Sequence, residues 1–226
     1  MDGKTGQREG NRLGNTPESP YLGTMNTDIS RRNIIKLGAA LTLFGCGRAA
    51  LADPVDERLS PRLLRDATMA FARHKGRLAH LDRIGIVDFS RPSSAARFFV
   101  VDVVSGTSQA HLVAHGRGSD PAHTGWARRF SNEPGSFASS TGAFVTGAEY
   151  AGHHGRSMRL VGLDPENCNA ESRAIVVHGA WYVTPEIAAR TGILGRSEGC
   201  FAVSNASLNQ VIDRLGPGRL LYAARS

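Results

Sequence analysis

The 226-residue sequence has few aromatic residues, 7% of the total, and no dense run of basic side chains. A net charge of +7 and a pI of about 9.9 would otherwise suggest a nucleic-acid partner. The first 52 residues hold seven Lys/Arg and four Asp/Glu, which leaves 20 basic and 16 acidic side chains in the remainder. Basic residues this dispersed argue against nucleic acid as a partner, and a mildly positive surface suits an anionic polymer.

Several catalytic motifs are also absent. No His-Glu-x-x-His or His-x-His occurs, which disfavours a zinc peptidase. The only lysine after residue 52 is Lys75, preceded three places earlier by Ala72, so the Ser-x-x-Lys motif of penicillin-binding enzymes is missing. Residues 195–199 spell Gly-x-Ser-x-Gly, but a serine hydrolase needs a later histidine and the last one is His178.

The N-terminal segment contains features of an export signal. Residues 30–36, Ser-Arg-Arg-Asn-Ile-Ile-Lys, resemble the twin-arginine signal, and a short apolar run follows. Ala50-Leu51-Ala52 has the small residues that signal peptidase needs, and the run is far shorter than the ~20 residues of a membrane span. Residues 1–52 are therefore expected to direct export to the periplasm or cell envelope, with 1–24 as a possible extension before Met25. Alternatively, Leu43–Cys46 loosely resembles a lipoprotein box, in which case lipid on Cys46 would hold the protein at the membrane.

The remainder is expected to form one mainly β domain with a few helices, of the α+β class. Residues 53–85 are predicted to be a helical segment, with an amphipathic helix from Pro61 to Lys75 capped by Ser60, and 86–226 the main domain. Predicted strands and helices of the main domain are a 98–104/110–114 hairpin, a strand at 158–163, a buried strand at 174–177 ending at His178, a helix between Ser204 and Gly216, and a strand at 220–223.

Only two cysteines follow the N-terminal segment, Cys168 and Cys200. In an exported protein they could form a disulfide. The alternative is that Cys200 is a reactive thiol, because it lies in a glycine-rich loop in which backbone N–H groups can approach a reacting carbonyl. A thiol needs an imidazole or a similar partner to become a nucleophile at neutral pH, and His178 at a strand end would be held rigidly enough.

The pattern His178-Gly179 followed by Gly195-Arg196-Ser197-Glu198-Gly199-Cys200 resembles the signature of the YkuD-like L,D-transpeptidases, in the subfamily whose cysteine motif reads Gly-Arg-Ser-x-Gly-Cys. The resemblance implies a β-sandwich or barrel-like catalytic domain that acts on peptidoglycan stem peptides. It extends over about residues 90–205, through Arg97–Asp102, His115-Gly116, Phe130–Asn132, Ser139–Gly142, Tyr150–Gly155 and Leu160–Leu163.

The resemblance also implies roles for individual residues. Cys200 would attack a stem tetrapeptide and expel the terminal D-alanine, as a thiolate–imidazolium pair with His178. The Gly179 carbonyl would orient the imidazole, and the N–H groups of Gly199 and Cys200 would hold the oxyanion. The acyl group would pass to an amine or to water, which gives transpeptidase or carboxypeptidase activity. Ser197 and Arg196 would shape the loop or hold a substrate carboxylate. His115 and Tyr150 either line the cleft or simply pack, and His154 is expected to bind substrate. No cofactor or metal is implied.

Two departures from the family pattern concern Glu198, where many members have histidine, and Ala202, where many have a polar or basic residue. Glu198 is expected to point outward, because a carboxylate beside the thiol would raise its pKa. Two alternatives stay open. One is a zinc-dependent cell-wall peptidase with ligands among His115, His153, His154 and His178, and the other is a non-catalytic peptidoglycan-binding protein.

Overall fold

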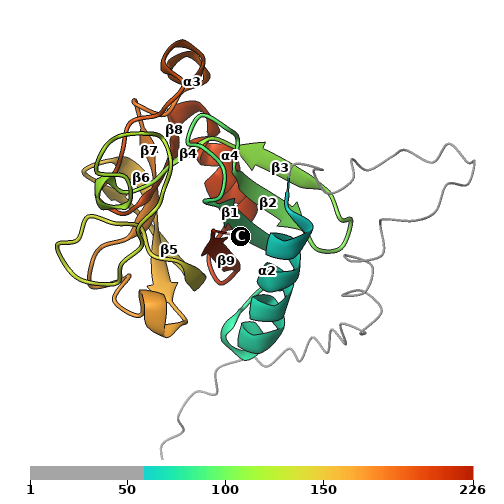
Figure 1. The fold of residues 1–226 in the computed structure, drawn as a ribbon. Coiled ribbons are helices and arrows are strands. Elements are labelled where there is room, and N and C mark those ends of the chain that lie inside the picture. Colours follow the sequence, from blue (N-terminus) through green and yellow to red (C-terminus); the bar gives the residue numbers. More distant parts are fainter. Residues whose placement is uncertain (1–58, 226) are drawn as a thin grey trace, which may run out of the picture.

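The computed structural model describes residues 59–225 (Figure 1). The predicted export signal at 1–52, its extension at 1–24 and Cys46 lie outside the described residues. Within them, most regular structure is β-strand, and three α-helices accompany it. The predicted mainly β architecture with a few helices is confirmed. No helix in this part of the chain is long and apolar enough to cross a membrane.

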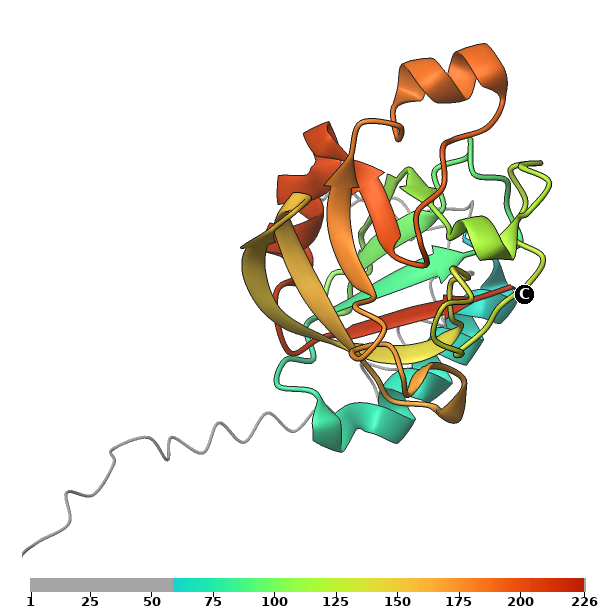
Figure 2. The same ribbon diagram turned by 90° about the vertical axis from the view of Figure 1, so that its left-hand side faces the viewer.

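All nine described strands belong to one sheet, in the order β3-β2-β1-β9-β5-β6-β7-β8-β4, and the sheet is not closed. Its edge strands β3 and β4 are separated in sequence by Leu112 alone, so the sheet must curl until its two edges approach each other (Figure 2). The strands are β1 (Arg83–Asp88), β2 (Phe98–Asp102), β3 (Ser108–His111), β4 (Val113–Ala114), β5 (Gly142–Gly152), β6 (Gly155–Gly162), β7 (Val176–Ala180), β8 (Phe201–Ser204) and β9 (Leu220–Ala224).

The helices begin and end at recognisable caps. Helix α2 (Pro61–His74) starts after Ser60, whose Oγ accepts a hydrogen bond from the Leu63 amide at 3.4 Å. Helix α4 (Asn205–Leu215) starts after Ser204 and stops at Gly216, as the sequence predicted. A third helix, α3 (Pro185–Thr191), was not predicted and projects from the body of the domain (Figure 1).

Both faces of the sheet are covered, one by α2 and the other by α4. Alternate residues of β1 show why: Ile84 and Ile86 pack with α2, while Val87 belongs to the cluster that contains α4. Each fully buried aliphatic side chain contributes about 1.5–3 kcal/mol to this packing. Because β1 begins at Arg83, the predicted boundary between residues 85 and 86 falls inside a strand, and the N-terminal helix shares the core of the main domain.

Three sequence predictions need correction. The returning strand predicted at 110–114 breaks at Leu112, where the chain leaves one sheet edge for the other. His178 lies inside β7 and not at its end, because the strand continues to Ala180 beside β8. The long strand β5 lies partly in a segment predicted to be mainly loops, since its glycines and polar residues hide the alternation that marks a strand.

Candidate active site

Strand β7 places the imidazole of His178 between its neighbours β6 and β8. His178 pairs with Ser157 on one side and with Ala202 on the other, and its side chain is buried. The ring Nδ1 lies 2.9 Å from the Gly179 carbonyl oxygen. Since a carbonyl can only accept, Nδ1 carries the proton and the lone pair of Nε2 is left to act as a base.

Cys200 directly precedes β8, the parallel neighbour of β7. Its thiol is half-buried and donates to the Ala174 carbonyl at 3.5 Å. Cys200 and His178 line the same cleft, whose volume is about 670 Å³. The two residues predicted to carry the chemistry thus face one cavity, although the described hydrogen bond of the thiol goes to a backbone carbonyl and not to the imidazole.

Ser197 closes a tight turn around the cysteine. Its Oγ donates to the Cys200 carbonyl at 2.7 Å and accepts from the Gly199 amide at 3.2 Å. Gly199 has φ +119°, a conformation that favours glycine. The prediction that the Gly199 amide binds the oxyanion needs correction, because Ser197 already occupies that N–H. The amide of Cys200 is the remaining backbone candidate.

A second segment, 115–117, holds this turn from the other side. The Ser197 amide donates to the His115 carbonyl at 3.0 Å, and the Arg117 amide donates to the Ser197 carbonyl at 2.8 Å. Ser139 joins the two segments: its Oγ accepts from the Gly116 amide at 2.9 Å and donates to the Gly199 carbonyl at 3.2 Å. The cysteine loop is therefore fixed by a network of backbone and hydroxyl hydrogen bonds.

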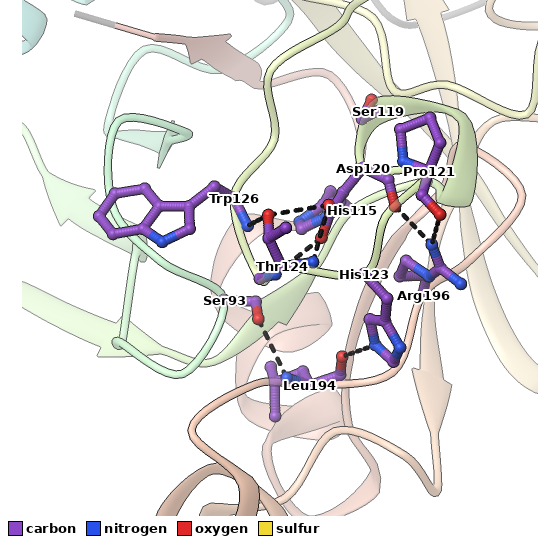
Figure 3. Close-up of polar contacts among 12 residues, drawn as sticks. Ser93, His115, Ser119, Asp120, Pro121, His123, Thr124, Trp126, Leu194 and Arg196 are labelled. Atoms are coloured by element: carbon purple, nitrogen blue, oxygen red, sulfur yellow. Dashed lines mark hydrogen bonds and ion pairs between the residues drawn. The ribbon is translucent and has the colours of Figure 1, made fainter.

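His115 does not line the cleft, so its expected role in substrate binding is corrected to the packing role that the sequence had left open. Its ring is fully buried beside Asp120 (Figure 3), and Arg97 Nη2 donates to its Nδ1 at 2.7 Å. Burial, and then the Arg97 cation, lower the pKa of His115 to about 3, so the ring is neutral at neutral pH. Asp120 accepts from the amides of Thr124 and Gly125 at 2.9 and 2.7 Å. This cluster supports the loop from beneath.

Arg196 lines the cleft and is anchored at one nitrogen. Its Nη1 donates to the carbonyl oxygens of Asp120 and Pro121, the latter at 3.2 Å (Figure 3). No other hydrogen bond of its guanidinium to the described residues is seen, so the rest of the planar fork is available for a carboxylate. The neighbouring Glu198 has a 70% exposed side chain and pairs with Arg117 at 3.2 Å. It also lines the cleft, and its charge raises the pKa of the Cys200 thiol, so the expectation that it points outward holds only in part.

The tip of the β5–β6 hairpin folds over β7. His154 stacks on His178 with ring centroids 4.1 Å apart and planes 19° apart, and His154 also contacts His153 edge-on. Tyr150, on β5 of the same hairpin, lines the same cleft. The guanidinium carbon of Arg159 lies 4.6 Å from the centroid of its ring. Both residues predicted from this hairpin therefore reach the cleft.

Burial decides the protonation of the pair. It raises the pKa of the Cys200 thiol, while the Val176 amide and the Arg173 cation oppose it. It also lowers the pKa of His178, against the hydrogen bond to Gly179, and the nearby His154 lowers it further. Each shift taken by itself favours the uncharged form, a thiol for Cys200 and a neutral imidazole for His178.

These shifts predict the pH dependence of thiol reactivity. Alkylation of Cys200 by iodoacetamide requires the thiolate, so its rate is expected to rise with pH through a midpoint above the ordinary thiol value of about 8.5. The measurement is the rate constant at Cys200 by peptide mass spectrometry, with N-acetylcysteine alongside as a reference. A rate that is already constant between pH 6 and 8 would show a preformed thiolate.

The structure also bears on the disulfide and on the zinc site that the sequence left open. Cys168 and Cys200 are both free, and Cys168 accepts from Asn132 Nδ2 at 3.1 Å outside the cleft. Among residues 59–225, no group of three or more His, Cys, Asp or Glu side chains is placed to hold a metal ion. A zinc interpretation thus has no ligand set in this region.

Sequence reasoning gave no role to four residues that build the site: Arg97, Asp120, Ser139 and Arg173. Arg97 and Ser139 lie in stretches that resemble the family, but their function depends on contacts with segments 18 and 60 residues away. No local spacing signals such contacts.

A curled open sheet with a cysteine and an Nδ1-protonated histidine in one cleft defines a candidate thiol acyl-transfer site. The profile of the L,D-transpeptidase catalytic domain family matches residues 55–224, so the chain belongs to this family. No curated protein matches the sequence.

Solved structures with a similar fold include three L,D-transpeptidases. That of Mycobacterium smegmatis is 15% identical (TM-score 0.39), and L,D-transpeptidase 3 of Mycobacterium tuberculosis is 12% identical (TM-score 0.41). The matches cover 63% and 64% of this chain, and only 58% and 61% of those chains. The enzyme of Xylanimonas cellulosilytica is 16% identical (TM-score 0.38), with 70% of this chain and 69% of that chain covered.

Proposed function

We propose that the protein is an exported peptidoglycan L,D-transpeptidase that works through a thioacyl-enzyme at Cys200. Membership of the L,D-transpeptidase family supports the reaction class. The observation that carries the mechanism is the shared cleft of Cys200 and His178, with the imidazole proton held on Nδ1 by the Gly179 carbonyl. Localisation in the envelope rests on the export motif in residues 1–52, and fractionation of cells that express the full chain tests it.

In the proposed first step, Nε2 of His178 removes the thiol proton of Cys200 while the sulfur attacks the carbonyl of the diamino acid in a stem tetrapeptide. A neutral imidazole is the form that can accept this proton, and the lowered pKa of His178 keeps it neutral. The tetrahedral oxyanion would accept a hydrogen bond from the backbone N–H of Cys200. His178 then gives its proton to the leaving amine, and D-alanine departs to leave a thioester.

In the second step an acceptor amine, or water, attacks the thioester. His178 removes a proton from the acceptor, and the sulfur leaves and recovers a proton. An amine of a neighbouring stem peptide gives a cross-link, whereas water gives a tripeptide, the carboxypeptidase product. The same residues serve both outcomes.

Substrate binding is assigned to three residues around the cleft. Arg196 is held by Nη1 to two backbone carbonyls, and its free donors suit a carboxylate of the stem peptide. Tyr150 and His154, which belong to the β5–β6 hairpin, also line the cleft. An acidic peptide would thus lie between a fixed cation and an aromatic wall.

The test is to incubate the full-length protein with disaccharide tetrapeptides and to identify the products by mass spectrometry. Cross-linked dimers whose donor stem peptide has lost D-alanine support transpeptidation, and tripeptides support carboxypeptidation. A mass increase on Cys200 during turnover would identify the thioester. Binding to peptidoglycan without any product would overturn the enzymatic proposal and favour a non-catalytic binding protein.

His154 provides a further prediction about the base. His154→Phe keeps a flat ring on His178 but removes the imidazole that lowers the pKa of His178, so that pKa is expected to rise. More of His178 is then protonated at pH 6, and the ratio of turnover at pH 6 to turnover at pH 8 falls roughly two- to threefold, because an exposed charge acts only modestly. The pH–rate profiles of both proteins check this, with His153→Phe as the matched control. An unchanged acidic limb would contradict it.

A further inference from the structure

Arg173 is a cleft residue to which neither family resemblance nor the proposed mechanism gives a role. It is half-buried and directly precedes Ala174, the residue whose carbonyl accepts the thiol of Cys200. Ala174 itself has φ +53°, an uncommon conformation for a residue with a Cβ. The backbone beside the thiol is thus held in a specific turn, and Arg173 lies at its start.

Both terminal nitrogens of the Arg173 guanidinium donate to one neighbouring segment, residues 131–140. Its Nη1 donates to the Ser131 carbonyl at 2.6 Å and to Ser140 Oγ at 2.7 Å, and its Nη2 donates to the Ala138 carbonyl at 2.6 Å and to Ser136 Oγ at 3.2 Å. Four of its five N–H donors are therefore used inside the protein. A substrate carboxylate would have to displace these bonds, which distinguishes Arg173 from Arg196.

The same guanidinium reaches the cysteine loop. A Cβ built on Gly199 would lie only 3.3 Å from Arg173 Nη2 and 2.8 Å from the Ala138 carbonyl oxygen. Arg173 therefore packs against the residue before Cys200 and joins the 131–140 segment to the loop that carries the thiol.

The positive charge of Arg173 is not neutralised at close range. Its four partners are uncharged oxygens, and no ion pair with a carboxylate is found for it among the described residues. Glu133 interacts with it only at longer range. Partial burial weakens the screening of such a charge by water, so an anion that forms nearby in the cleft would be stabilised.

We propose that Arg173 is a positioning residue that holds the cysteine loop in place and supplies the positive charge that stabilises the thiolate of Cys200. This inference rests on the nucleophilic role of Cys200 proposed above. The other titratable groups that line the cleft are His178, His154, His153, Tyr150, Tyr182, Arg196 and Glu198. Of these, Glu198 opposes the thiolate, and Arg196 is bound to carbonyls of another segment.

The test measures alkylation of Cys200 by iodoacetamide in the full-length protein across pH 6.5–10, with mass spectrometry of the Cys200 peptide. Arg173→Gln removes the charge, so the midpoint moves to higher pH and the rate at pH 8 falls about tenfold. Arg173→Lys keeps the charge and should stay within about threefold of the wild-type rate. The rate at the high-pH plateau reports access to the thiol, whereas the midpoint reports the charge.

Arg190→Gln is the matched control, because it removes an exposed arginine from α3 and should leave the midpoint unchanged. An unchanged midpoint in folded Arg173→Gln overturns the proposal, as does a Lys variant that shifts as far as Gln. If thermal melting shows that Arg173→Gln does not fold, the Lys variant decides: lysine cannot reproduce the four contacts, so a retained midpoint supports the role of charge and a raised one refutes it. Alkylation needs no peptidoglycan, so a failure here is distinct from a failure of the turnover assay.

Discussion

Replacement of Cys200 by alanine is expected to abolish formation of cross-linked dimers and tripeptides, with a loss of at least about 10⁴-fold in turnover. No other described thiol lines the cleft, and Ser197 cannot replace the nucleophile because its Oγ is bound to the Cys200 carbonyl and the Gly199 amide. Product mass spectrometry gives the rate. The melting temperature should change little, since the thiol is half-buried at an open cleft and its removal leaves no enclosed cavity.

Cys168→Ala is the matched control, because it removes the other described thiol at a site outside the cleft. Its turnover should equal that of the wild type. Residual activity above about one per cent in Cys200→Ala would contradict a thioester mechanism and would require a different nucleophile. Equal losses in both variants would point instead to damage that any cysteine replacement causes.

The two residues proposed as nucleophile and base could be singled out from sequence because each has a local signature. Cys200 follows a glycine-rich loop, and His178 follows an apolar run that had to be a buried strand. The caps of α2 and α4 were equally local, since Ser60 and Ser204 each precede the helix that they cap. Patterns within about ten residues therefore predicted several of the helices and strands and the two residues, Cys200 and His178, that line one cleft.

The rest depended on contacts between distant segments. Arg97, His115 and Asp120 form their buried cluster only because the chain passes from β3 at one sheet edge to β4 at the other, a crossing that alternation in 110–114 does not reveal. The glycine-rich loop suggested that the Gly199 amide would be free to bind an oxyanion, but the sequence could not show that the Ser197 hydroxyl accepts its hydrogen bond. Burial of the thiol, which raises its pKa, is likewise a property of the folded cleft and not of the local sequence.

The crowded backbone beneath the cysteine loop leads to the second large expected effect, that of Gly116→Ala. A Cβ at this position would lie 2.3 Å from the Phe137 carbonyl oxygen and 2.7 Å from both Cα and N of Gly199. These are backbone atoms, so no side-chain rotation can relieve the contact. Gly116 has φ −68°, which any residue adopts, so the glycine is required for close approach and not for its backbone angles.

Gly116→Ala is therefore expected to push the Gly199–Cys200 backbone away from the 115–117 segment, with a loss of about 1–3 kcal/mol of stability. A displacement of about 1 Å at the nucleophile costs on the order of 100-fold in turnover, so activity should fall even while the protein remains folded. Thermal melting and product analysis measure the two effects. Gly76→Ala is the control, because a Cβ there meets no atom within 4 Å, and both properties should stay at the wild-type level. If Gly116→Ala also behaved like the wild type, the cysteine loop would be free to shift without loss of function, and the hydrogen bonds from 115–117 and Ser139 could not be what holds the thiol in position.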